Sequence, residues 1–256
     1  IMSTVVFANQ RTGSSTLSYW FEAGNEKSVI SLYEPPFTKY PLHRREDPSL
    51  EIFDDKNGIF REVMQKYKNK EIKLSYFEEL VRDIFAHKIV FKVMIEYTPL
   101  EVVEIIIKHM SLFQYTGAMI VRNNIIEKFK SLHFSYTNNV YSNDGMHDNM
   151  LKHRIQDVHI DEYVKLQKNI NESNRVVEDL LLAYKVKYAY MSYEDIFESK
   201  MSDELLYKYL RYLGYNPDER QDLRTYDLPG KMKTREYYNV EGLDLLVQRF
   251  KQEKLL

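Results

Sequence analysis

The sequence predicts an α/β protein, with a central parallel sheet of about five strands between two layers of helices. Apolar segments typical of buried strands lie at residues 4–8, 28–32, 88–94, 117–121 and 186–191. Amphipathic patterns typical of helices lie at residues 15–21, 58–67, 76–86, 99–110, 124–137, 161–184 and 203–213. Because strands alternate with helices, right-handed crossovers should join neighbouring strands and cover both faces of the sheet.

The chain reads as a single domain over residues 1–256. It has only seven prolines and eight glycines, and no stretch resembles a linker or an internal repeat. Residues 38–57 and 138–159 are polar and irregular, and we interpret them as insertions. Since insertions near the carboxyl ends of the strands shape ligand pockets in open α/β folds, we expect these two to recognise the acceptor substrate.

Composition limits the partners. The formal net charge is −2, whereas a nucleic-acid-binding protein normally carries a clear basic excess. The absence of cysteine excludes disulfides, thiol nucleophiles and Cys-ligated metals, and fits a reducing compartment such as the cytoplasm. No apolar run reaches the roughly 18 residues of a membrane-spanning helix. We therefore expect a cytoplasmic protein that binds neither nucleic acid nor membrane.

The first predicted strand leads directly into the loop Asn-Gln-Arg-Thr-Gly-Ser-Ser-Thr at residues 9–16. Gly13 permits a tight turn, and the helix that follows would direct its unpaired N–H groups at a ligand oxygen. Arg11 adds a positive charge. Further donors come from the hydroxyls of Thr12, Ser14, Ser15 and Thr16. This loop predicts a phosphate- or sulfate-binding site.

The loop does not match the common nucleotide motifs. It has one glycine and no Gly-Lys-Ser/Thr, so it is neither a Walker loop nor a three-glycine dinucleotide loop. Taken alone, it is also compatible with an ordinary Ser-rich helix cap.

A second strand-to-helix junction carries an arginine. The apolar segment 118–121 ends at Arg122, and a predicted helix continues through Ser131. Asn124 and Ser131 are seven residues apart, so they lie on nearly the same helix face. The other, core-facing stripe should contain Ile125, Phe129, Leu132 and Tyr136. For Arg122 alone, a surface salt bridge is the default interpretation.

The two junctions together resemble the 5′-phosphosulfate loop and the 3′-phosphate site of sulfotransferases that use 3′-phosphoadenosine 5′-phosphosulfate (PAPS). The spacing of nine residues from Arg122 to Ser131 is similar to that of the bacterial sugar-type branch. The resemblance implies a P-loop-like three-layer fold, with residues 11–16 at the 5′ end of the nucleotide and Arg122 and Ser131 at its 3′-phosphate. It also implies PAPS as co-substrate, adenosine 3′,5′-bisphosphate (PAP) as product, and no metal.

Further segments extend the resemblance from Val5 to about Phe250. Residues 91–94 resemble an internal strand of the family, and residues 191–196 resemble its Tyr-Glu-Asp-Leu element. By this resemblance Tyr193 contacts adenine, and Lys231 and Lys233 lie where relatives place a basic contact to the 3′-phosphate. We expect Glu194 and Asp195 to cap the helix that follows them.

The resemblance also indicates a general base. Where animal cytosolic sulfotransferases place a histidine, two residues after the strand lysine, this chain has Met94. Tyr33-Glu34-Pro35 instead resembles the Tyr-Glu-Pro segment of the bacterial sugar-type and lumenal enzymes, which implies Glu34 as the base. Glu34 could equally be a solvated loop carboxylate. Lys92 could stabilise the bridging oxygen or extend its amine to solvent from a buried strand.

The function that the resemblance implies is that of a PAPS-dependent sulfotransferase, of the EC 2.8.2 type. It would move a sulfuryl group to a hydroxyl, or an amine, of a carbohydrate-like or other small-molecule acceptor. Two alternatives stay open: a P-loop-like, ATP- and magnesium-dependent kinase of a small molecule, and a non-catalytic nucleotide-binding protein.

Overall fold

A parallel sheet forms the centre of the protein. The computed structural model describes residues 4–14, 17, 30–32, 66, 69–71, 73–86, 89–138, 153–198, 202–213 and 240–256. Within them, five parallel strands lie in the spatial order β2-β3-β1-β4-β6. Their bounds are Thr4–Ala8 for β1, Ile30–Leu32 for β2, Ile89–Met94 for β3, Thr116–Val121 for β4 and Tyr188–Ser192 for β6. The predicted α/β class with a parallel sheet is confirmed.

Strand β1 lies at the middle of this sheet. Its register runs from Thr4 opposite Val90 of β3 and Thr116 of β4 to Ala8 opposite Met94 and Ile120. All five of its residues are buried. Such burial on both faces is typical of parallel sheets and explains why the segment is continuously apolar after Thr4.

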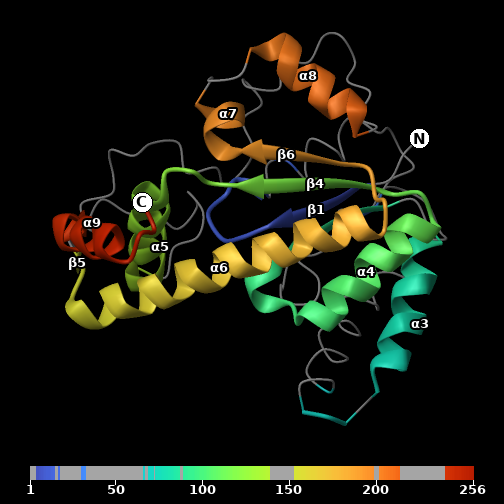
Figure 1. Cartoon of the computed structure of the whole chain (residues 1–256), viewed down its shortest axis with the longest axis horizontal. Coiled ribbons are helices and arrows are strands. Elements are labelled where there is room, and N and C mark those ends of the chain that lie inside the picture. The colour runs from blue at the N-terminus through green and yellow to red at the C-terminus, as the bar shows by residue number, and fades with distance from the viewer. Residues whose placement is uncertain are drawn as a thin grey trace.

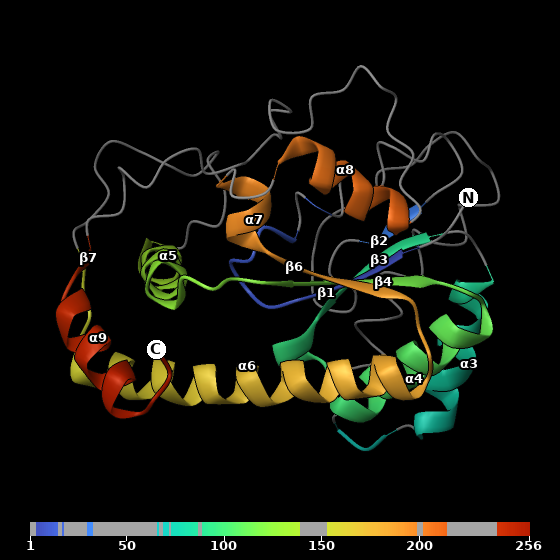
Figure 2. The ribbon, with the colours of Figure 1, turned by 45° about the horizontal axis from the view of Figure 1, so that its top comes forward.

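Three helices cover one face of the sheet, as Figure 2 shows below the strands. They are α3 (Leu74–Phe85), α4 (Leu100–Leu112) and α6 (Asp157–Ala183). Helix α4 buries its apolar stripe here, including Val103 and Ile107, against Val5 and Phe7 of the sheet. At 1.5 Å per residue, the 27 residues of α6 reach about 40 Å, so this helix extends well beyond the sheet.

The opposite face carries α7 (Tyr193–Phe197) and α8 (Asp203–Tyr212), which lie above β6 and β4 in Figure 1. Leu206 and Leu210 of α8 pack there with Val6, Ala8 and Leu17. Hydrogen bonds fasten the end of α8 to the sheet: the hydroxyls of Thr4 and Thr116 both donate to the Leu213 carbonyl, at 3.0 and 2.8 Å.

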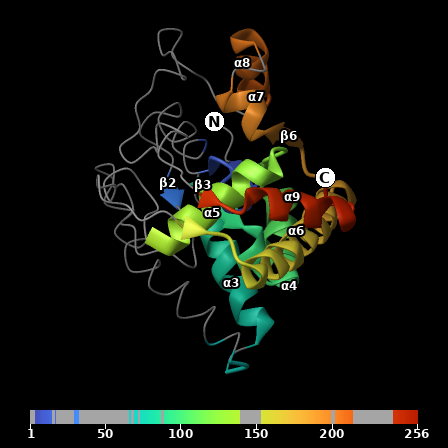
Figure 3. The ribbon, with the colours of Figure 1, turned by 90° about the vertical axis from the view of Figure 1, so that its left-hand side faces the viewer.

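A third cluster lies beyond the carboxyl ends of the strands. It joins α5 (Ile125–Asn138), the first half of α6, α9 (Leu243–Gln252) and the short parallel pair β5 (His153–Arg154) and β7 (Val240–Glu241). Figure 3 views the molecule from this side, with α5 and α9 in front of the sheet. The buried side chains at its centre include Phe129, Tyr163 and Phe250.

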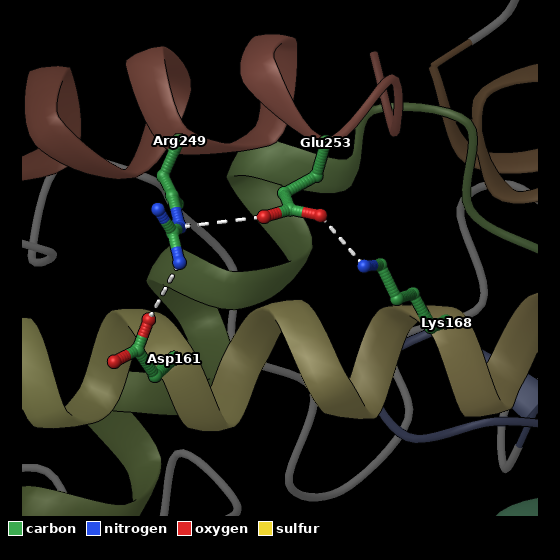
Figure 4. A network of polar contacts seen from close by, with 4 residues as sticks. All are labelled: Asp161, Lys168, Arg249 and Glu253. Carbon is green, nitrogen blue, oxygen red and sulfur yellow. Dashed lines mark hydrogen bonds and ion pairs between the residues drawn. The ribbon is translucent and has the colours of Figure 1, made fainter.

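An ion-pair network fixes α9 to α6 on the outside of this cluster (Figure 4). Arg249 donates to Asp161 at 3.3 Å and lies 3.7 Å from Glu253, whose other oxygen accepts from Lys168 at 2.6 Å. These side chains are largely exposed, so the network positions the helix more than it stabilises the fold.

Of the predicted insertions, residues 38–57 lie outside the described residues. Within 138–159, the described residues form the end of α5, strand β5 and the first turn of α6. In the part of the chain that the structure describes, no helix combines the length and apolarity needed to cross a membrane.

Candidate functional site

The carboxyl ends of β1 and β4 form the candidate site. The two strands are neighbours, and the chain leaves them in opposite directions, toward β2 from β1 and toward β6 from β4. Open α/β sheets bind ligands at such a point, because the diverging connections leave a crevice. The loop after β1 and the turn after β4 therefore lie side by side.

The loop after β1 has an unusual backbone. Arg11 and Gly13 both adopt the left-handed conformation, with φ angles of 62° and 75°. A Cβ on Gly13 would lie 2.3 Å from Cε2 of Phe197 in α7, so only glycine fits this position. Thr12 is buried and its hydroxyl donates to the Asn9 carbonyl at 2.8 Å. That hydroxyl therefore holds the loop in shape.

Arginine side chains join the two predicted motifs. Arg11 Nε donates to Ser131 Oγ at 2.9 Å, across 120 residues of sequence. Arg122 Nη1 donates to the Arg11 carbonyl at 3.2 Å. The sequence motifs at residues 11–14 and 122–131 thus form one cationic crevice.

Arg122 is largely enclosed within this crevice. Its guanidinium lies 4.3 Å from the centre of the Tyr193 ring, in a cation–π contact. Among the described residues its buried Nε has no hydrogen-bond partner. Burial lowers the pKa of Arg122, but an arginine keeps its charge at any physiological pH. The Tyr193 ring also packs against the Phe197 ring, with the ring centres 4.9 Å apart.

Glu194 holds the turn after β4 in place. The prediction that it caps its own helix, α7, is wrong. Its buried carboxylate accepts from the backbone N–H groups of Asn123 at 3.0 Å and Asn124 at 2.8 Å, ahead of α5. Its own helix α7 is capped instead by Ser192, whose hydroxyl accepts from the Asp195 N–H. Glu194 therefore neutralises the positive end of a neighbouring helix.

Helix α5 presents Ser131 to the crevice. Asn124 caps the helix by accepting from the Glu127 N–H at 3.1 Å. Ser131 and the apolar core residue Phe129 are both buried. The prediction that Tyr136 belongs to the core-facing stripe is wrong. Tyr136 is 46% exposed, because its hydroxyl reaches out to donate to Gln10 Oε1 at 2.7 Å.

The structure adds a carboxylate that sequence reasoning missed. Glu96 follows β3 in a short 3₁₀ helix (η2, Ile95–Tyr97), and its Oε1 accepts from the Gln10 N–H at 2.5 Å. The only sequence signal was its position just after a strand that pairs with β1. Lys92 lies in β3 opposite Val6 and is 1% exposed, so its amine does not extend to solvent.

Six predicted residues remain, of which the structure describes only Ser14. Ser14 is buried at the start of the helical turn after the loop. Five others lie outside the described residues: Ser15, Thr16, Glu34, Lys231 and Lys233.

Fold and site together define an α/β protein with two arginine side chains at the switch point of a parallel sheet. Within the described residues, no three acidic or histidine side chains converge as metal ligands would. Comparison with known proteins places the chain no further, since no family model, curated protein or solved structure matches it.

Proposed function

We propose that this protein is a PAPS-dependent sulfotransferase with a P-loop-like three-layer fold. The observation that carries the proposal is the hydrogen bond from Arg11 to Ser131, together with the contact of Arg122 with the Arg11 carbonyl. Two motifs that separately resemble the phosphosulfate loop and the 3′-phosphate site meet at the ends of adjacent strands. One nucleotide with phosphates at both ends accounts for both.

The crevice suits a doubly charged adenosine. Two guanidinium groups and a buried hydroxyl offer charge-assisted hydrogen bonds, for which arginine is well suited. Tyr193, held by Arg122 and Phe197, is the residue proposed to contact adenine. Because Arg11 and Ser131 bond to one another here, ligand binding would exchange that bond for bonds to phosphate oxygens.

In the proposed reaction an acceptor hydroxyl oxygen attacks the sulfur of PAPS. The S–O bond to the 5′-phosphate breaks and its electron pair leaves on the phosphate oxygen of PAP, while the hydroxyl proton passes to the carboxylate of Glu34. Arg11 and Lys92 would stabilise the charge that develops on the leaving oxygen, as in phosphoryl transfer. Lys231 and Lys233 would add charge at the 3′-phosphate, and the acceptor is a carbohydrate-like or other small molecule.

Two rival functions make different predictions. A kinase needs ATP with magnesium, whereas the proposed enzyme binds PAP in a metal-free buffer. A non-catalytic nucleotide-binding protein would bind PAP but transfer no sulfate from labelled PAPS to any acceptor.

Calorimetric titration of PAP in the presence of a chelator tests the proposal directly. We expect saturable binding that Arg11→Ala weakens on the order of tenfold or more, since a hydrogen bond to a charged group contributes about 1.5–3 kcal/mol. Arg175→Ala, which removes an exposed arginine of α6 bonded to Glu172, is the matched control and should bind as wild type. Tighter binding of ATP with magnesium than of PAP would favour the kinase.

The base is tested separately. Glu34→Gln should leave PAP affinity unchanged and abolish sulfate transfer, with Glu172→Gln on the exposed face of α6 as the control. Normal turnover in Glu34→Gln would exclude this glutamate as the base.

A further inference from the structure

A polar pocket on the α6 side of the candidate site shares the loop after β1 and the turn after β4 with that site, through Thr12 and Arg122. Its volume is about 160 Å³, and the residues that line it include Asn9, Arg122, Lys128, Gln167, Asn171 and Asn174. Tyr190 also lines it, and strand alternation places that residue on the same face as Tyr188, which packs on the α4 and α6 side. None of the described residues lining the pocket is acidic.

Internal hydrogen bonds occupy the amide oxygens around this pocket. Lys128 Nζ donates to Gln167 Oε1, and Gln167 Nε2 donates to Asn171 Oδ1 at 2.6 Å. Asn9 Nδ2 donates to Asn174 Oδ1 at 2.8 Å. Three carboxamide groups of α6 therefore have their acceptors engaged.

The hydrogen-bonding groups of the pocket that remain unpaired within the described residues are mainly donors. The Nδ2 groups of Asn171 and Asn174 donate to no residue that the structure describes, and Lys128 uses one of its three N–H donors on Gln167. The buried Nε of Arg122 is also without a partner within the described chain. One acceptor, Asn9 Oδ1, is buried without a partner as well.

The positive charge of Lys128 has no bonded carboxylate among the described residues to balance it. Lys128 is 3% exposed and belongs to the first turn of α5, where the helix dipole is itself positive. Its direct contacts are neutral: Gln167 and the ring of Phe129, 4.9 Å from Nζ. Glu96 attracts it through space and Arg122 repels it, and burial lowers its pKa to about 8. A buried cation without a bonded carboxylate is costly unless an anion joins it.

We propose that this pocket binds one tetrahedral oxyanion, a sulfate or phosphate group. Two cations line it, which matches the charge of a dianion, and its free donors converge from three elements: α5, α6 and the end of β4. At about 30 Å³ per water molecule, its volume holds roughly five waters, so the ligand group is small. The anion is either the free ion or the head group of a small ester.

The oxyanion site does not depend on the proposed sulfotransferase activity. It shares Thr12 and Arg122 with the nucleotide crevice, but Lys128 and the α6 amides line the pocket and make none of the contacts of Arg11 and Ser131. Binding of inorganic anions can therefore be measured without PAPS, and its loss need not affect PAP binding.

The test is calorimetric titration of the full chain with inorganic sulfate, inorganic phosphate and glycerol 3-phosphate, at constant ionic strength in chloride buffer. We expect saturable binding of at least one of these, weakened at least tenfold by Lys128→Met. Lys130→Met removes the same charge from the same helix but outside the pocket, where Lys130 pairs with Glu127 at 3.6 Å, and it should bind as wild type. Asn171→Asp, at an exposed position, should also weaken binding by repulsion.

The source of the anion follows from the same titrations. Stronger binding of the inorganic ions indicates a free-ion site, and stronger binding of glycerol 3-phosphate indicates a head-group site. Arg11→Ala should weaken the binding of PAP and leave that of the anion unchanged, whereas Lys128→Met should weaken the binding of the anion and leave that of PAP unchanged. Two outcomes would overturn the inference: no saturable binding by wild type, or unchanged binding by Lys128→Met.

Discussion

Replacing Lys128 with methionine should stabilise the protein while removing anion binding. Burial lowers the pKa of Lys128 from 10.5 to about 8, and a tenfold change in acidity corresponds to about 1.4 kcal/mol. The charged side chain is therefore disfavoured by about 3 kcal/mol at pH 7. Methionine has a similar length and no charge, but it leaves Gln167 Oε1 without its donor, which costs about 1–2 kcal/mol. The net expectation is a gain of about 1–2 kcal/mol in the free energy of unfolding, or about 2–8 °C in Tm.

The same reasoning predicts how the gain depends on pH. Between pH 8 and 10.5 the unfolded wild type still holds the lysine proton, whereas the folded protein has released it. Wild-type stability therefore rises with pH in this window relative to the variant. The advantage of Lys128→Met should disappear between about pH 9 and 10, and wild type should be the more stable protein at about pH 10.5. The anion affinity of wild type should fall over the same range above pH 8, as Lys128 loses its charge beside Glu96 and Arg122.

Urea unfolding in chloride buffer, from pH 7 to 10.5, measures both effects. Subtracting the variant from wild type removes the contribution of the tyrosines, such as Tyr188, whose pKa is raised to about 12. Saturating sulfate or phosphate should stabilise wild type alone and reduce the difference. A variant less stable than wild type at pH 7, or a difference independent of pH, would refute the assignment of Lys128 as an uncompensated buried charge.

Other substitutions test the supports of the site by urea unfolding. Gly13→Ala should lower the free energy of unfolding by about 2 kcal/mol or more, because Gly13 has a positive φ and an added Cβ would overlap Phe197. Phe197→Leu in the same chain should restore part of the loss. An alanine variant as stable as wild type would show that the loop can relax. Glu194→Gln should cost about 2–3 kcal/mol, because its NH₂ group faces a backbone N–H that the carboxylate now accepts; a loss below about 0.5 kcal/mol would contradict that role. Arg249→Ala should change stability by less than about 1 kcal/mol, since its ion pairs are exposed, and a larger loss would mean that the network supports the fold.

The sheet could be predicted from local pattern alone. Strand β1 has the predicted bounds, and the other four strands begin or end within two residues of the predicted positions. A buried parallel strand is apolar on both faces, so its signal is strong and continuous. Helix α6 begins at Asp157, four residues before the predicted start, because Gln156 and His159 form a capping box within a segment that looked irregular.

The site was less predictable because its contacts are not local. Glu194 was expected to cap the helix that it begins, yet it binds the amides of a turn about 70 residues earlier. Lys128 and Gln167 meet only because α5 crosses α6, a packing angle that no single-helix pattern encodes. Arg11 and Arg122 were expected to serve opposite ends of a ligand, and the structure adds a direct link from the backbone of one to the side chain of the other.

The central position of β1 has a consequence for biosynthesis. The ribosome makes this strand before the two strands that cover its edges, the second of which starts at Thr116, 112 residues after Thr4. At 5–20 residues per second, that interval is about 6–20 s. During it a strand that is apolar after Thr4 has unsatisfied hydrogen-bonding groups on both sides, which is the state in which nascent chains associate with one another. Yield on expression should therefore depend on chaperone supply and growth temperature more than on the stability of the finished fold.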